Sequence, residues 1–132
     1  MIKIIRLINA LLKRKFAKYF IPALWIMLIS YISFADFSGI DEKSIRIPYF
    51  DKLVHLLMYF SLTYILIVSR ILTKKYYKFF AVVFGLLFGI LAELLQHFIF
   101  TYRTGDIMDF VFNSIGIFTS LLFYNKLEHL ID

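Results

Sequence analysis

Three long apolar stretches of the chain carry ionisable and amide side chains at helical spacing. In the first, Asp51, His55 and Tyr59 are each four residues apart and would share one face of a helix. In the second, Glu93 and Gln96 share a face. A histidine beside a carboxylate can transfer protons as an acid–base pair. We therefore take His55 and Glu93 as the candidate catalytic residues.

The third stretch has polar or small residues at steps of three and four along an otherwise apolar helix: Asp106, Asp109, Asn113, Gly116 and Ser120. Carboxylates and imidazole are ligands for divalent metal ions, so these residue types leave a metal-assisted reaction open. The sequence has no HExxH, GxSxG or CxxC motif and no glycine-rich phosphate loop. It therefore identifies no particular reaction or cofactor.

Eight residues on or next to these faces are candidates for binding a ligand: Asp51, Lys52, Tyr59, Gln96, Arg103, Asp106, Asp109 and Asn113. The two bases among them, with Arg46, are available to meet a phosphate or a carboxylate. Each polar residue also has a structural interpretation. The aspartates would cap helices, and Asn113 would join two helices by a hydrogen bond.

The composition indicates that a membrane accommodates these helices. Of the 132 residues, 61% are apolar and only 18% are charged, whereas a soluble domain is about 45–50% apolar. This hydrophobicity argues against disorder, and the lack of cysteine excludes disulfides and thiolate metal sites. The pattern predicts an all-α, single membrane domain over residues 1–132, a four-helix bundle. Its transmembrane helices are expected at about 18–36, 51–70, 76–99 and 107–125.

The N-terminal region is expected to form a short amphipathic helix before the first transmembrane helix. Within residues 2–12, isoleucines and leucines alternate with Lys3, Arg6 and Asn9 at helical spacing, which suits a helix on the cytoplasmic surface. A basic leader without a role of its own is the alternative. Residues 33–35 loosely resemble a signal-peptidase site, but the apolar run before them is long and bulky. This favours an uncleaved helix.

Charge alternates along the chain as the positive-inside rule predicts for cytoplasmic N and C termini. Residues 1–18 carry a net charge of +6 and residues 70–78 carry +4. Two other segments are acidic, with −1 for residues 35–52 and −2 for residues 93–109. The excess of 15 basic over 9 acidic residues therefore reflects topology and attraction to anionic membrane lipid. It does not indicate a nucleic-acid partner.

With this topology, the polar faces of the second, third and fourth transmembrane helices all lie at the outer ends of those helices. Glu93 is then roughly one and a half turns below the surface, where an unpaired carboxylate is costly. We expect it to pair with His55, Lys52 or Arg103. The three faces are expected to meet in the outer leaflet of the membrane.

These residues resemble the sequence pattern of the VanZ-like membrane proteins. The segment DKLVHLLMY at residues 51–59 matches DKxxHxxxY, and ELLQ at residues 93–96 matches ExxQ. The segment RTGDIMDFVFNSIG at residues 103–116 supplies RxxDxxD and NxxG. The resemblance covers residues 51–120, and the four-helix layout extends it to the whole chain. It implies a multi-pass protein of the bacterial cell membrane that acts at the cell envelope. The family is named after a protein associated with resistance to teicoplanin, a lipid-bearing glycopeptide antibiotic.

Three classes of function are compatible with these features. The one we favour is binding or modification of an amphiphile in the outer leaflet, such as a lipid-linked cell-wall precursor or a lipoglycopeptide, with a contribution to glycopeptide resistance. The second is an intramembrane enzyme, metal-assisted or not, that acts on a lipid or glycan. The third is a helix bundle whose polar residues only fix packing. The sequence leaves open whether the protein is an enzyme, and it leaves the oligomeric state open.

Overall fold

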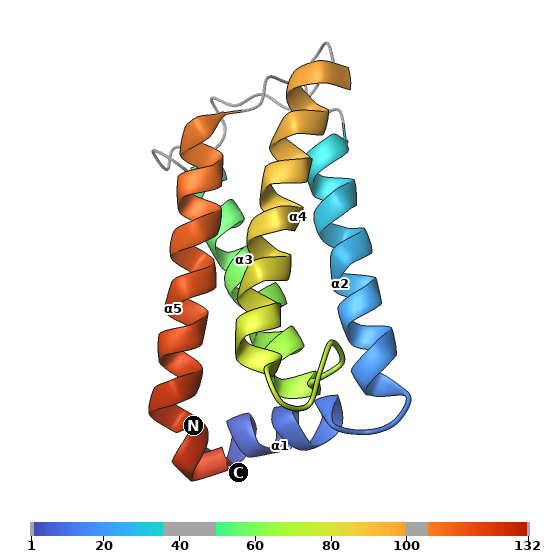
Figure 1. Ribbon diagram of the computed structural model, residues 1–132, viewed down its shortest axis with the longest axis vertical. Coiled ribbons are helices and arrows are strands. Elements are labelled where there is room, and N and C mark those ends of the chain that lie inside the picture. The colour runs from blue at the N-terminus through green and yellow to red at the C-terminus, as the bar shows by residue number, and fades with distance from the viewer. Residues whose placement is uncertain (1, 36–49, 100–105, 132) are drawn as a thin grey trace.

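The structure, a computed structural model, describes residues 2–35, 50–99 and 106–131, and α-helices make up most of them. In chain order these are α1 (Ile2–Leu12), α2 (Ala17–Phe34), α3 (Phe50–Ser69), α4 (Tyr77–Ile99) and α5 (Ile107–Ile131). The helices α2 to α5 stand side by side as a bundle, and α1 lies across one end of it (Figure 1). The expected all-α fold is confirmed.

Four of the described helices, α2 to α5, are long and apolar enough to cross a membrane. Many large apolar side chains on them face outward, including Phe20, Met27, Phe79, Leu87 and Leu122, as lipid-facing residues do. The chain is therefore a multi-pass membrane protein. The first three of these helices begin and end within two residues of the expected positions.

The last helix, α5, continues past the expected end near residue 125 to Ile131. Lys126 ends the apolar run, but a charge alone does not end a helix. Glu128 on the next turn accepts hydrogen bonds from Tyr77 at 2.7 Å and from Lys78 at 2.6 Å. These contacts join the ends of α4 and α5, and they stabilise the extra turns.

The most extensive helix packing is between α3 and α5, and Gly116 allows it. A Cβ atom at Gly116 would lie 2.2 Å from the carbonyl oxygen of Leu56, a distance that no side chain can occupy. Gly85 and Gly89 on α4 are packed less tightly. There a Cβ would meet side chains, at 3.1 Å for Gly85 and 3.4 Å for Gly89. Among the described glycines, Gly116 of α5 therefore makes the closest contact with the backbone of a neighbouring helix.

The short helix α1 is attached to the bundle by one buried face. Its Asn9 side chain is 2% exposed and accepts a hydrogen bond from the Tyr64 hydroxyl at 2.9 Å, and Leu12 is buried beside it. Ile4 and Leu7 are exposed on another face. The helix predicted for residues 2–12 is therefore present and amphipathic.

Basic residues gather at the end of the bundle where α1, the α3–α4 connection and the end of α5 lie (Figure 1). The start of α3, the end of α4 and the start of α5 lie at the opposite end (Figure 1). The three polar faces identified in the sequence therefore occur at one end, as expected.

Candidate functional site

The first turns of α3 and α5 are joined by ion pairs centred on Lys52. Its ammonium group lies 2.5 Å from a carboxylate oxygen of Asp106, 2.5 Å from one of Asp109 and 3.1 Å from one of Asp51. The side chains of Lys52 and Asp109 are only 12% and 9% exposed, so this pairing is largely shielded from water. The ammonium of Lys52 is therefore engaged by acids of its own chain, whereas the sequence suggested that it was available to a ligand.

Asp106 connects three helices at this end. Its carboxylate accepts a hydrogen bond from the backbone N–H of Met108 at 2.8 Å, so Asp106 is the N-cap of α5, as considered from the sequence. Its own backbone N–H donates to Glu93 Oε2 on α4 at 3.0 Å. The hydrogen bond from Lys52 on α3 holds the pKa of the Asp106 carboxyl below its usual range. Asp106 is therefore ionised at neutral pH.

His55 is buried between α3 and α5, at 3% exposure, and two residues of α5 orient its ring. Nδ1 lies 3.0 Å from Asn113 Oδ1, and Nε2 lies 3.6 Å from Asp109 Oδ2. Because an amide oxygen can only accept a hydrogen bond, Nδ1 carries the proton. In the neutral ring, Nε2 then presents its lone pair toward the Asp109 carboxylate.

One ligand atom from each of His55, Glu93 and Asp109 lies within 4.8 Å of the others. The three residues come from α3, α4 and α5, so the expected convergence of the three polar faces is confirmed in geometry. An imidazole and two carboxylates at this spacing suit either proton transfer or the binding of a divalent metal ion.

Three other candidate residues are buried but make different contacts. Gln96 donates from Nε2 to the carbonyl oxygen of Ser33 at 2.7 Å, which ties α4 to α2. Tyr59 is fully buried and packs against Gly89, and its hydroxyl has no hydrogen-bond partner within the described ranges. The same holds for Asn113 Nδ2. Gln96 thus joins two helices through Nε2, while its Oε1 also has no hydrogen-bond partner among the residues that the structure describes.

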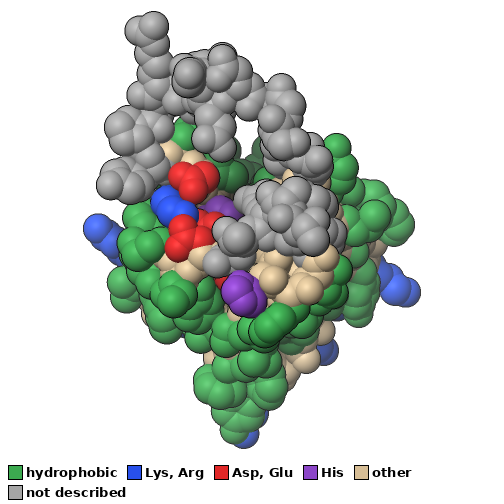
Figure 2. All heavy atoms as spheres, turned by 90° about the horizontal axis from the view of Figure 1, so that it is seen from above, with side chains coloured by type: hydrophobic (Ala, Val, Ile, Leu, Met, Phe, Trp, Pro, Cys, Tyr) green, Lys and Arg blue, Asp and Glu red, His purple; other side chains and the backbone are tan. Residues whose placement is uncertain are grey.

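We call the residues that meet at this end of the bundle the polar cluster: Asp51, Lys52, His55, Tyr59, Glu93, Asp106, Asp109 and Asn113. Viewed from this end, acidic and basic side chains form one patch with hydrophobic side chains around it (Figure 2). Arg46 and Arg103, which the sequence also suggested as ligand contacts, lie outside the described residues.

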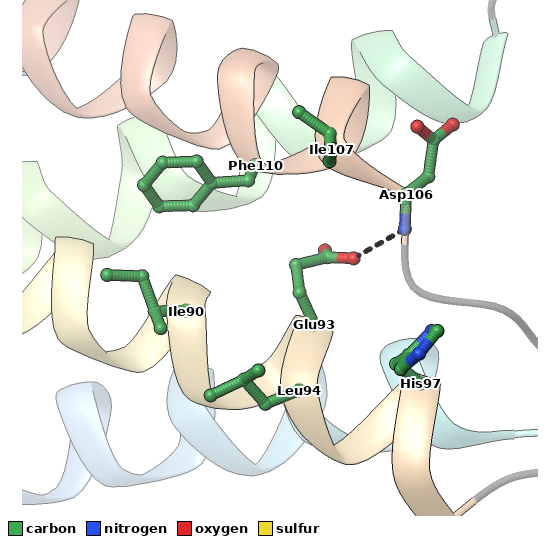
Figure 3. Close-up of a pocket in the computed structure, with 7 residues that line it drawn as sticks. All are labelled: Ile90, Glu93, Leu94, His97, Asp106, Ile107 and Phe110. Carbon is green, nitrogen blue, oxygen red and sulfur yellow. Dashed lines mark hydrogen bonds between the residues drawn. The ribbon is translucent and has the colours of Figure 1, made fainter.

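A hollow of about 350 Å³ opens between α4 and α5 beside the polar cluster. Its lining residues define the α4–α5 groove: Ile90, Glu93, Leu94, His97, Asp106, Ile107 and Phe110 (Figure 3). Ile90, Leu94 and Ile107 are exposed, so the groove opens through the side of the bundle. The Glu93 carboxylate points across it toward the start of α5, where it meets the Asp106 backbone (Figure 3).

The α4–α5 groove, with His97 in its wall, was not predicted from the sequence. The available signal was the helical neighbourhood of Glu93: Ile90 precedes it by three residues, and Leu94 and His97 follow it by one and four residues. These side chains resemble ordinary lipid-facing residues, and only the partner helix α5 turns them into the wall of a groove.

The chain matches the model of the protein family described as VanZ/LLP1 over residues 5–128. This covers nearly the whole chain, including every residue of the polar cluster. No curated protein and no solved structure matches the chain.

Proposed function

The chain belongs to the VanZ/LLP1 family, and we propose that it binds an amphiphile of the bacterial cell envelope. The polar headgroup would lie at the polar cluster, and the apolar chain would lie in the α4–α5 groove. One observation carries the proposal. The groove joins exposed apolar side chains, Ile90 and Leu94, to the carboxylates of Glu93 and Asp106 within one hollow. An amphiphile in a membrane leaflet has the same arrangement of apolar and polar parts.

The charge distribution supports an outer-leaflet position for this site. The end of the bundle that bears α1 carries nearly all the basic residues of the described ranges: Lys3, Arg6, Lys13, Arg14, Lys15, Lys18, Arg70, Lys74, Lys75, Lys78 and Lys126. Within those ranges, Lys52 is the one lysine or arginine at the opposite end. The positive-inside rule then orients α1 toward the cytoplasm and the polar cluster toward the outside.

The charge of the polar cluster limits the headgroups that it accepts. Its four carboxylates exceed its single ammonium group, and that ammonium is already paired with three of them. Amino and hydroxyl groups suit such a surface because they donate hydrogen bonds to carboxylates. A lipid-linked cell-wall precursor and a lipoglycopeptide antibiotic both combine such groups with an apolar chain. Binding of the lipoglycopeptide antibiotic would contribute to glycopeptide resistance.

Site-specific photo-crosslinking in membranes tests the proposal. A photoreactive amino acid replaces Leu94, which lines the groove, or Leu87, which is exposed two turns earlier on the same helix and outside the groove. The probe is an alkyne-tagged lipid-linked disaccharide–peptide precursor. We expect capture at position 94 to exceed capture at position 87 several-fold and to be lost with Glu93→Gln. Equal capture at the two positions would refute a specific site.

A reaction on the bound amphiphile is the second candidate function, and the environment of His55 favours it. A neutral imidazole whose Nε2 faces a carboxylate can accept a proton from water or from a substrate hydroxyl. Mass spectrometry of the precursor after incubation with the purified protein distinguishes a reaction from binding alone. A changed mass that requires His55 would indicate an enzyme, and an unchanged mass would indicate a binding protein.

A further inference from the structure

We infer that His55, Glu93 and Asp109 form a site for one divalent metal ion that accepts nitrogen and oxygen ligands, with Zn²⁺ the best fit. In tetrahedral zinc sites, ligand atoms about 2.1 Å from the ion lie roughly 3.4 Å from one another. His55 Nε2 and Asp109 Oδ2 lie 3.6 Å apart, which is long for a hydrogen bond but close to this ligand spacing. The inference does not depend on the proposed function, because ion binding is measurable without an amphiphile.

The orientation of the histidine matches that of a metal ligand. A metal-binding imidazole usually donates its other N–H group to an oxygen that fixes the ring, and Asn113 Oδ1 accepts that hydrogen bond from His55 Nδ1 at 3.0 Å. Asp109 is oriented in a similar way, since Lys52 contacts its Oδ1 atom and leaves Oδ2 directed toward His55. His55 Nε2 and Asp109 Oδ2 therefore face each other at a spacing at which one cation can bind both atoms.

The net charge of the cluster also favours a cation. Within the described ranges it holds four carboxylates, those of Asp51, Glu93, Asp106 and Asp109, and one ammonium group, which gives a formal charge of −3 with neutral His55. Asp109 is buried and Glu93 is half-buried, so a cation bound between them would offset the charges that are least accessible to water. One divalent ion would reduce the charge to −1.

Buried hydrogen-bond donors beside the three ligand residues are a second, independent observation in favour of a bound ion. Tyr59 lies one turn from His55 on the same face of α3, is fully buried and lies within range of the charge of Glu93. Its hydroxyl and Asn113 Nδ2 lack hydrogen-bond partners within the described ranges. Three protein ligands leave one tetrahedral position open, as in catalytic zinc sites, and these donors suit an oxygen ligand of the ion in that position.

The test measures metal content on the full chain, purified in detergent with an affinity tag that contains no histidine. The protein is stripped with a chelator, dialysed against ZnCl₂ and analysed by elemental mass spectrometry. We expect the wild-type chain to hold about one zinc ion. We expect His55→Gln, Glu93→Gln and Asp109→Asn each to weaken binding by about tenfold or more. Glu128→Gln removes a carboxylate at the opposite end of the bundle, and it should leave binding unchanged.

Thermal unfolding of the same samples gives a second readout. Because an ion that binds only the folded state stabilises it, zinc should raise the melting temperature of the wild-type chain but not that of Asp109→Asn. Zinc content far below one ion per wild-type chain at saturation would overturn the inference. So would full zinc content in all three ligand variants. If a variant fails to fold, the wild-type stoichiometry and melting shift decide the question without it.

Discussion

The backbone N–H of Asp106 donates a hydrogen bond to Glu93 Oε2 across 3.0 Å, so the residue that caps α5 is held by a carboxylate of α4. Glu93 therefore has a structural contact as well as a place in the polar cluster. The two roles make different demands on the side chain. The contact needs only an acceptor oxygen, whereas proton transfer or metal binding needs the carboxylate.

Glu93→Gln separates these roles. The amide keeps an oxygen that can accept the hydrogen bond from Asp106, so we expect a normal amount of protein in the membrane. It lacks the charge and basicity of the carboxylate, so we expect function to fall. The measurement is teicoplanin susceptibility of cells that express each variant, with immunoblotting of membranes. Glu128→Gln is the control, and wild-type susceptibility with Glu93→Gln at normal abundance would reduce Glu93 to a packing residue.

The Lys52 network should be far more important for stability than the ion pair at the other end of the bundle. Lys52→Met leaves the carboxylates of Asp106 and Asp109 close together without a counter-charge, which we expect to cost about 3–5 kcal/mol. Lys78→Met breaks the pair with Glu128, whose side chains are about one-third exposed, and should cost about 0–1 kcal/mol. Denaturation in detergent measures both.

A double substitution tests the cause of that loss. If the uncompensated carboxylate destabilises Lys52→Met, the further change Asp109→Asn should recover part of the stability. Purely additive losses in the Lys52→Met/Asp109→Asn variant would show that the two side chains do not act as a pair.

Gly116→Ala should disrupt the bundle, because the new Cβ would meet the carbonyl oxygen of Leu56 and backbone cannot move aside cheaply. Overpacking of this kind costs about 1–3 kcal/mol or more. Gly89→Ala is the matched control, since its Cβ would make ordinary contact with Tyr59 at 3.4 Å. The readout is the melting temperature of each purified variant. Equal melting temperatures would show that the α3–α5 contact is looser than described.

The topology predicts that the α3–α4 connection and the C terminus are cytoplasmic. Reporter fusions after residue 75 and at the C terminus should both give an internal signal. A matched fusion within residues 36–49 should give an external signal. An internal signal there, or an external one at residue 75, would place the polar cluster on the wrong face for the proposed function.

The sequence predicted much of this arrangement because helical periodicity is a local property. The spacing of Asp51, His55 and Tyr59 defines a face of α3, and alternating topology brings it to the same end as Glu93 and Asp109. Contacts that depend on which helices are neighbours were not predictable in this way. The hydrogen bond from Gln96 to Ser33 requires α2 to pack beside α4, and no spacing in either segment indicates that.

The α4–α5 groove was also not predictable from the sequence, because its exposed apolar residues have no distinctive pattern. Ile90 and Leu94 look like any residues that face acyl chains, and their sequence gives no sign of a hollow between α4 and α5.

The close packing at Gly116 was predictable only in part. Small residues at helical spacing indicated close packing somewhere, but the identity of the partner and the closest point depended on the three-dimensional arrangement of α3 and α5.

Because the α4–α5 groove opens sideways, the composition of the surrounding leaflet controls how often the groove is occupied. An amphiphile that enters from the leaflet reaches the groove by lateral diffusion, in two dimensions. Occupancy then depends on its mole fraction among the lipids, and its concentration in the surrounding water matters only through partitioning. An intrinsically weak site would therefore be filled whenever its ligand is abundant in that leaflet, and titrations should vary the ratio of ligand to lipid at constant protein.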